Sequence, residues 1–157
     1  MFLFLKLIHI LSATLLFGAG VASAYALFRA HFSADRKRIS ITLDQVIHAD
    51  MIFTAPAGIV QFASGWWMML LAGYSFTGWL LWALILYLIA LCTWLPAAYL
   101  QTRMRKILQN SPPGTTLPGD YVRSWRIWAL LGLPSFAAML LLFYTMVWKR
   151  MPFESGF

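Results

Sequence analysis

The stretch MIFTAPAGIVQFASGWWMMLLAGYSFTGWLLWALILYLIALCTWLPAAYLQT, residues 51–102, contains no charged side chain. It is too long for a single membrane crossing, because about 20 apolar residues already span the hydrocarbon core. The segment GYSFTG at 73–78 is rich in turn-forming residues and divides the stretch. The sequence therefore predicts two membrane-spanning helices here, over residues 51–72 and 79–101.

Two further uncharged runs are each long enough for one crossing. LIHILSATLLFGAGVASAYALF lies between Lys6 and Arg29, and the second run covers residues 127–148. AlaSerAla at 22–24 resembles a signal-peptide cleavage site, but the apolar segment exceeds the about 7–15 residues of a signal core, which favours a retained helix. We therefore predict four transmembrane helices, over residues 5–28, 51–72, 79–101 and 127–148.

The composition excludes a soluble domain. Hydrophobic residues make up 61% and charged residues 11% of the 157 positions, whereas about a quarter of positions are charged in soluble domains. Continuous apolar runs also exclude a transmembrane barrel, whose strands alternate. Cys92 is the single cysteine and has no disulfide partner within the chain. The fold class is therefore all-α: residues 1–157 form one up-down bundle of four transmembrane helices.

The basic residues fall mainly in two predicted loops. Loops 29–49 and 103–126 hold Arg29, Arg36, Lys37, Arg38, Arg103, Arg105, Lys106, Arg123 and Arg126, and the opposite side holds Lys6, Lys149 and Arg150. The positive-inside rule therefore predicts cytoplasmic loops and periplasmic termini in a bacterial cytoplasmic (inner) membrane. Because no aromatic residues interleave with the charges at 36–38, we expect anionic lipid and not nucleic acid as their partner.

Two connecting segments carry further expectations. Residues 110–119, NSPPGTTLPG, are typical of a turn-rich connector. Residues 121–128, YVRSWRIW, are predicted to approach the last helix at headgroup level.

Small residues four positions apart in the first span predict close helix packing. These pairs are Gly18 with Ala22, Ala19 with Ser23, and Gly20 with Ala24. The sequence leaves open whether this face packs inside the bundle, against lipid, or against a second copy of the chain. Prolines inside three spans predict kinks, at Pro56, Pro96 and Pro134.

Few polar residues lie at membrane depth, where they are costly and often functional. His9 follows Lys6 by three residues near the predicted outer surface. Its imidazole has the chemistry to ligate a haem iron through one nitrogen. The alternative is a neutral histidine that is hydrogen-bonded across helices.

Gln61 and Asp50 are the other polar candidates. We expect Gln61, in the middle of its span, to form an interhelical hydrogen bond. We expect Asp50 to be the N-cap of the helix over 51–72, or to pair with an arginine at the same boundary: Arg29, Arg103 or Arg126. His48 and Asp50 alone make a poor metal signal.

Aromatic and sulfur side chains gather near the same predicted depth as His9. Trp66, Trp67, Trp79 and Trp82 fit an aromatic belt. A methionine thioether, with Met69 as the candidate beside Met68 and Met146, has the chemistry of a second axial haem ligand. Filling of gaps in the core is the alternative role. Signatures of hydrolases, NTPases, zinc proteases and covalent haem attachment are absent from the sequence.

Four segments together resemble a bacterial family of predicted integral membrane proteins of unknown function, the domain of unknown function 2269. They are LKLIHILSATLLFGAG at 5–20, ADMIFTAPAGIVQFASGWWM at 49–68, WLPAAYLQTRMR at 94–105 and LPGDYVRSWRIWALLGLPSFAAM at 117–139. The resemblance covers nearly the whole chain and implies the fold, but no activity.

The order of features also resembles the four-helix HemJ-type protoporphyrinogen oxidases and, less closely, the CopD copper-resistance membrane domain. The resemblance places the HemJ helix-one histidine, a haem-ligand candidate, on His9. It matches a TPA-like element to residues 54–56 and a terminal VVKP-like segment to residues 147–152, with the lysine on Lys149. Lys6 and Lys149 would then face the haem propionates.

This chain differs from the HemJ pattern at one position in the third span. HemJ proteins carry a lysine in a WLHAKL-like segment, whereas this chain has TrpLeuLeuTrpAlaLeu at 79–84, with Ala83 in place of the lysine. Protoporphyrinogen oxidation is therefore not expected, and no catalytic residue is predicted.

The leading sequence-based hypothesis is a membrane protein that binds haem b with His9, Lys6, Lys149 and Met69, in a redox or electron-transfer role. The alternative is a cofactor-free structural or accessory membrane protein that assembles with itself or with a larger complex. A metal exporter or small transporter, as CopD implies, is less supported, because four spans without an inverted repeat are few for transport.

Overall fold

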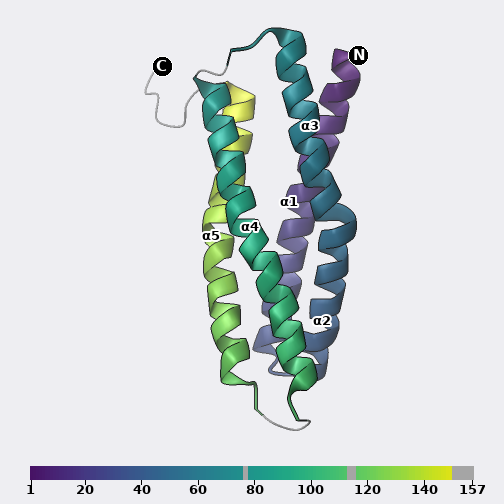
Figure 1. Ribbon diagram of the computed structural model, residues 1–157, viewed down its shortest axis with the longest axis vertical. Helices are drawn as coiled ribbons and strands as arrows, with labels where there is room; N and C mark the ends of the chain where they lie inside the picture. The colour runs from purple at the N-terminus through teal and green to yellow at the C-terminus, as the bar shows by residue number, and fades with distance from the viewer. Residues whose placement is uncertain (76–77, 113–115, 150–157) are drawn as a thin grey trace.

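A computed structural model describes residues 1–75, 78–112 and 116–149, and the described part is helical throughout except for short connections (Figure 1). Its elements are α1 (Phe2–Phe32), α2 (Arg36–Ala49), the π-helical segment η1 (Asp50–Thr54), α3 (Ala55–Ala72), α4 (Trp79–Asn110) and α5 (Gly119–Trp148). Four helical rods are long and apolar enough to cross a membrane, because α2, η1 and α3 form one continuous rod. The predicted all-α membrane bundle is confirmed.

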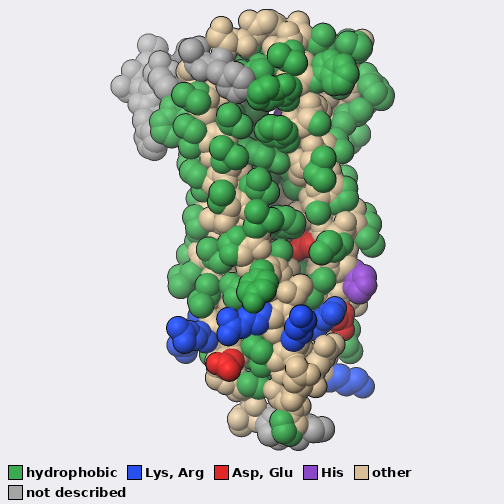
Figure 2. Space-filling view, viewed as in Figure 1, with side chains coloured by type: hydrophobic (Ala, Val, Ile, Leu, Met, Phe, Trp, Pro, Cys, Tyr) green, Lys and Arg blue, Asp and Glu red, His purple; other side chains and the backbone are tan. Residues whose placement is uncertain are grey.

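The rods alternate in direction (Figure 1). Met1, the turn at Gly73 and the end of α5 lie at one end of the bundle, which we call the N-terminal end. Ser33 and Ser111 lie at the other end, which we call the arginine end. Figure 2 shows the lysine and arginine side chains of this face in a band near the arginine end, below a broad hydrophobic surface. This surface is the part that lies in the hydrocarbon core.

The predicted loop over 29–49 is wrong for most of its length, because α1 continues to Phe32 and α2 begins at Arg36. Asp35 caps α2, since its carboxylate accepts hydrogen bonds from the backbone N–H groups of Lys37 and Arg38. Ile39, Leu43 and Val46 are buried on one face of α2. The charges of this segment therefore belong to an amphipathic helix and not to a loop.

The predicted loop over 103–126 is also shorter than expected. Helix α4 continues to Asn110 and α5 begins at Gly119, and part of the connector, residues 113–115, lies outside the described residues. Tyr121 is 0% exposed, and Trp128 is also buried. Residues 121–128 therefore belong to the first turns of α5 and do not precede it, with Tyr121, Ser124 and Trp128 on its buried face and Arg123 and Arg126 exposed.

The larger hydrophobic core lies at the arginine end. Its buried residues come from four helices: Leu27, Ala30, Ile39, Leu43, Leu100, Met104, Leu108, Tyr121 and Trp128. The Arg36 side chain donates hydrogen bonds to the carbonyl oxygens of Leu108, Ser111 and Pro112 at the end of α4. Arg36 thus supplies a donor to the Leu108 carbonyl, which the end of α4 leaves without an intrahelical partner, and to two carbonyls of the segment that follows.

Toward the N-terminal end the helices pack as two pairs, α1 with α3 and α4 with α5. Leu86, Ala90, Ala138 and Leu142 form the core between α4 and α5. Aromatic side chains form contacts between the two helix pairs. Phe17 of α1 stacks on Phe136 of α5 with 5.7 Å between ring centroids. The Tyr87 hydroxyl of α4 donates a hydrogen bond to the Gly58 carbonyl of α3 over 2.9 Å.

The predicted packing of the small residues of α1 is only partly right. Ser23 is buried. However, a Cβ atom on Gly18 or Gly20 would meet no other atom of the described residues within 4 Å. These two glycines face away from the rest of the described bundle, so a dimer through this face stays a prediction.

Candidate functional site

Four buried polar side chains line one face of the rod formed by η1 and α3, and we call them the polar face: Asp50, Thr54, Gln61 and Ser64. Each is 5–6% exposed. Their spacing of four, seven and three residues returns to the same side of a helix. At 1.5 Å per residue the polar face is about 21 Å long, or about two thirds of the hydrocarbon core.

His9 of α1 joins the polar face near the N-terminal end. Its Nδ1 lies 2.9 Å from the Ser64 hydroxyl oxygen, and its Nε2 lies 2.9 Å from the Gln61 amide nitrogen. The Gln61 amide oxygen accepts a hydrogen bond from the Ser12 hydroxyl. The predicted interhelical hydrogen bond of Gln61 is therefore confirmed, with two partners on α1.

The hydrogen bonds around His9 are consistent with one tautomer. Because the Gln61 nitrogen can only donate, Nε2 of His9 accepts and Nδ1 carries the proton. This Nδ1–H donates to the Ser64 oxygen, and the Ser64 hydroxyl donates in turn to the Val60 carbonyl over 2.6 Å. Every polar group of the cluster then has a partner, which is what burial inside the membrane requires.

The His9 ring also packs closely against the α3 backbone. A Cβ atom on Gly65 would lie 3.0 Å from Cε1 of His9. Real Cβ atoms rarely come so close, so the absence of a side chain at Gly65 is what lets the ring reach Gln61 and Ser64.

Asp50 begins the polar face toward the arginine end. It lies six residues beyond Asp44, which forms an ion pair with Arg105 over 3.2 Å. Asp50 is therefore about 9 Å deeper in the bundle than this charged layer. Its carboxylate accepts a hydrogen bond from the Thr54 hydroxyl over 2.8 Å and is also hydrogen-bonded to the Gln101 side chain of α4.

The backbone around Asp50 is π-helical. The Ala55 N–H group bonds to the Asp50 carbonyl, five residues back. The next residue, Pro56, has no N–H group to donate to Ile52, which suits a widened turn. Such single π turns often occur at functional sites and change the direction in which side chains point.

Two predictions for Asp50 are therefore wrong. It is not an N-cap, because the helix runs through it from Arg36 to Ala72. It does not pair with Arg29, Arg103 or Arg126, because its recorded partners are Thr54 and Gln101. His48 does not join it either, since its Nδ1 lies 2.7 Å from the Asp44 carbonyl on an exposed face.

A family model described as a predicted integral membrane protein (DUF2269) matches residues 3–150. The chain belongs to the DUF2269 family. No curated protein matches it, and no solved structure does. The likeness to HemJ and CopD proteins therefore remains a resemblance between short segments.

The other predicted site residues of this DUF2269 protein are spread around the N-terminal end. Lys6 is exposed on α1, three residues before His9, and Met69 is buried on α3. Lys149 is exposed after α5, with its Nζ 5.9 Å from the centre of the Tyr74 ring. Among the described residues, no recorded hydrogen bond joins these three side chains to His9. Arg150 and the rest of the VVKP-like segment lie outside the described part of the chain.

The arrangement of His9 does not fit an iron ligand as it stands. An axial histidine needs one ring nitrogen that is free to face the iron, whereas both ring nitrogens of His9 face protein partners in this DUF2269 chain. In the same described part, no three His, Cys, Asp or Glu side chains gather at a site for a metal ion. Haem binding at His9 stays a prediction and would require the loss of one of these hydrogen bonds.

Three members of the site were missed in the sequence: Ser12, Gln101 and Tyr87. Ser12 follows His9 by one helical turn, which was a usable signal. Gln101 and Tyr87 are isolated polar residues in an apolar segment, and their partners lie on another helix. Spacing within one segment cannot identify such pairs.

Proposed function

We propose that this membrane protein transfers protons along the polar face, with His9 and Asp50 as the two groups that bind and release them. Chains of acidic, imidazole and hydroxyl groups inside transmembrane bundles are typical of proton relays. The observation that carries the proposal is the set of partners around His9, which can satisfy the imidazole in both of its protonation states.

The neutral imidazole accepts from the Gln61 amide nitrogen, as described above. When Nε2 of His9 gains a proton, a flip of the Gln61 amide presents its oxygen to the new N–H group. The amide nitrogen then donates to the Ser12 oxygen, and the Ser12 hydroxyl turns to the His9 carbonyl oxygen, 3.0 Å away. Protonation thus exchanges hydrogen bonds and leaves no buried group without a partner.

The partners of Asp50 have the same property. The Thr54 hydroxyl either donates to a carboxylate or accepts from a carboxylic acid. The Gln101 amide offers a nitrogen to the charged form and an oxygen to the neutral form. Asp50 can therefore hold or release a proton without moving out of the core.

Tyr87 and Gly58 lie between the two proton-binding groups. Gly58 follows Thr54 by four residues and precedes Gln61 by three, and its carbonyl accepts from the Tyr87 hydroxyl. Successive residues of this path are thus displaced by about 4.5–6 Å along the axis of the helix. Single water molecules bridge gaps of this size, and we include them in the proposed path.

Proton flux into vesicles tests the proposal. The full chain is reconstituted in liposomes that contain a pH-sensitive dye, and a valinomycin-set potassium potential drives protons. We expect flux above that of protein-free vesicles, and a loss of at least about tenfold in Asp50→Asn and His9→Gln, which remove the titrating groups. Thr14→Val is the control, because Thr14 is an exposed hydroxyl on α1 that donates to the Ile10 carbonyl. Wild-type flux equal to that of empty vesicles, or unchanged flux in Asp50→Asn, contradicts the proposal.

Haem binding in a redox role is the second candidate. Its support is the sequence resemblance and the exposure of Lys6, near the start of α1, and of Lys149, directly after α5. A reduced-minus-oxidised spectrum of the protein in mild detergent, with haem supplied, tests it. A Soret band that disappears in His9→Gln supports haem, whereas the absence of any band excludes this candidate.

Assembly with a second copy or a larger complex, through the face that holds Gly18 and Gly20, is a separate proposal. It is compatible with either proton transfer or haem binding.

The orientation is also a proposal. The excess of arginine and lysine at the arginine end supports a cytoplasmic position for that end, and so periplasmic termini, in a bacterial cytoplasmic membrane. Asp50 then lies toward the cytoplasm and His9 toward the periplasm.

A further inference from the structure

A groove of about 420 Å³ lies between the end of α1 and the start of α2, at the arginine end. Six residues line it: Tyr25, Phe28, Arg29, Phe32, Ser33 and Arg38. Tyr25, Arg29 and Ser33 are four residues apart and so form one stripe along α1. The groove is separate from the polar face.

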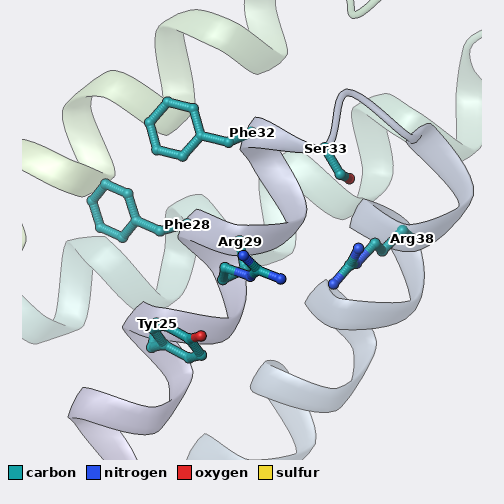
Figure 3. A pocket seen from close by; sticks show the side chains of 6 residues that line it. All are labelled: Tyr25, Phe28, Arg29, Phe32, Ser33 and Arg38. Atoms are coloured by element: carbon teal, nitrogen blue, oxygen red, sulfur yellow. The ribbon is translucent and has the colours of Figure 1, made fainter.

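Two guanidinium groups face each other across this groove. Figure 3 shows Arg29 reaching from α1 and Arg38 reaching from α2 toward one another. Among the described residues, the recorded ion pair is that of Arg105 with Asp44, and neither Arg29 nor Arg38 contacts a carboxylate. Two like charges that face each other without an acid between them repel, and a bound anion would remove this repulsion.

The nearest acid in the chain is already engaged. Asp35 lies in the turn between α1 and α2, where its carboxylate accepts from the backbone N–H groups of Lys37 and Arg38. The Ser33 hydroxyl is also used, since it donates to the Ala30 carbonyl over 2.6 Å. None of the six residues that line the groove is acidic, so the groove itself offers an anion two arginines.

The position of the groove selects the kind of anion. Arg29 ends the uncharged run of α1, so it lies where the hydrocarbon core meets the headgroups. Tyr25 lies one turn further into the membrane and is 67% exposed. Phe28 also lines the groove, at nearly the depth of Arg29. A ligand with a phosphate at the arginines and an apolar chain along Tyr25 and Phe28 fits this arrangement.

We infer that the groove binds the phosphodiester headgroup of an anionic phospholipid from the leaflet at the arginine end. Arg29 and Arg38 hold the phosphate oxygens from two sides, since guanidinium groups pair with phosphate through parallel hydrogen bonds. Tyr25 and Phe28 contact the upper part of an acyl chain. The bound lipid thereby links α1 to α2 where the chain reverses direction. This inference does not depend on proton transfer.

Native mass spectrometry of the full chain tests the site. The protein is purified in detergent, mixed with equal amounts of phosphatidylglycerol and phosphatidylcholine, and the retained lipid is counted at increasing collision energy. We expect preferential retention of phosphatidylglycerol by the wild type. Retention should fall about fivefold for each arginine removed in Arg29→Gln/Arg38→Gln, the usual effect of one basic residue at an anionic surface.

A matched double variant distinguishes binding in the groove from a general effect of positive charge on lipid retention. Arg123→Gln/Arg126→Gln removes the same charge from exposed positions on α5, and we expect it to retain phosphatidylglycerol as the wild type does. Equal losses in the two double variants, or no loss in Arg29→Gln/Arg38→Gln, overturn the inference.

Two further arms complete the test. Arg29→Lys/Arg38→Lys keeps the charge and the fold but removes the paired hydrogen bonds, so we expect retention between those of the wild type and the glutamine variant. Unchanged retention in the lysine variant contradicts the geometry proposed here. Inorganic phosphate at millimolar concentration should not displace the lipid. Displacement would mean that the groove takes free phosphate and not a lipid headgroup.

Discussion

His9 and Ser64 are 55 positions apart in the sequence, yet Nδ1 of His9 lies 2.9 Å from the hydroxyl oxygen of Ser64. This contact, together with that of Nε2 with Gln61, sets the register between α1 and α3. Apolar burial gives little preference for one register inside a lipid bilayer. The polar groups therefore decide how these two helices align, and the same groups make up the proposed proton site.

Removal of the imidazole should weaken the pairing of α1 with α3. In His9→Ala, Gln61 and Ser64 each lose a partner inside the membrane, which should cost about 1–2 kcal/mol. Thermal unfolding in detergent, followed by circular dichroism, measures the change. Thr14→Val should unfold at nearly the wild-type temperature, and an equal loss in both variants would argue against a special role for His9.

A methyl group at Gly65 should disturb the same contact. The Cβ atom of Gly65→Ala would lie 3.0 Å from a ring that is held by two hydrogen bonds. Overpacking of this kind costs about 1–3 kcal/mol. Gly18→Ala is the matched control, because its Cβ meets no described atom within 4 Å and alanine is the better helix former. Both variants are compared by their unfolding temperatures, and a Gly65→Ala protein as stable as Gly18→Ala would contradict the close packing.

Arg36 should stabilise the end of α4. Arg36→Ala removes the donors to the carbonyl oxygens of Leu108, Ser111 and Pro112, at a cost of about 1–2 kcal/mol. Lys37→Ala removes one charge next to it, from an exposed side chain, and should have little effect. Hydrogen exchange of residues near Asn110 measures the local loss. Equal exchange in the two variants would show that the carbonyls do not depend on Arg36.

The proposed orientation predicts opposite labelling of the two ends. In a Cys92→Ala background, Tyr74→Cys lies at the N-terminal end and Ser33→Cys at the arginine end. A thiol reagent that does not cross membranes should label Tyr74→Cys from the periplasmic side of intact spheroplasts and should label Ser33→Cys only after permeabilisation. The reverse pattern would invert the orientation while leaving the bundle unchanged.

The sequence was sufficient for the number and order of the transmembrane helices, because uncharged runs of adequate length depend on composition alone. It was also sufficient for the interhelical bond of Gln61, since an amide at membrane depth requires a partner. The alternative for His9, a histidine hydrogen-bonded across helices, agrees with the contacts to Gln61 and Ser64.

The sequence was not sufficient for the arginine end. The cluster of charges there predicts loops, although Ile39, Leu43 and Val46 follow the spacing of an amphipathic helix. The prediction of an N-cap at Asp50 fails for the same reason, because α2 runs directly into η1. A π turn has no sequence signature of its own, and the bond of Asp50 with Gln101 joins residues 51 positions apart on different helices.

The central claim is that His9 exchanges a proton while Gln61 turns its amide. Solid-state NMR of ¹⁵N-labelled protein in lipid bilayers, recorded across a range of pH, observes both groups. We expect a neutral imidazole with its proton on Nδ1 at high pH, a reversible change to imidazolium as the pH falls, and a change in the Gln61 amide signal with the same midpoint. An imidazole that never titrates in the folded protein, or a Gln61 signal that stays constant while His9 titrates, would contradict the account.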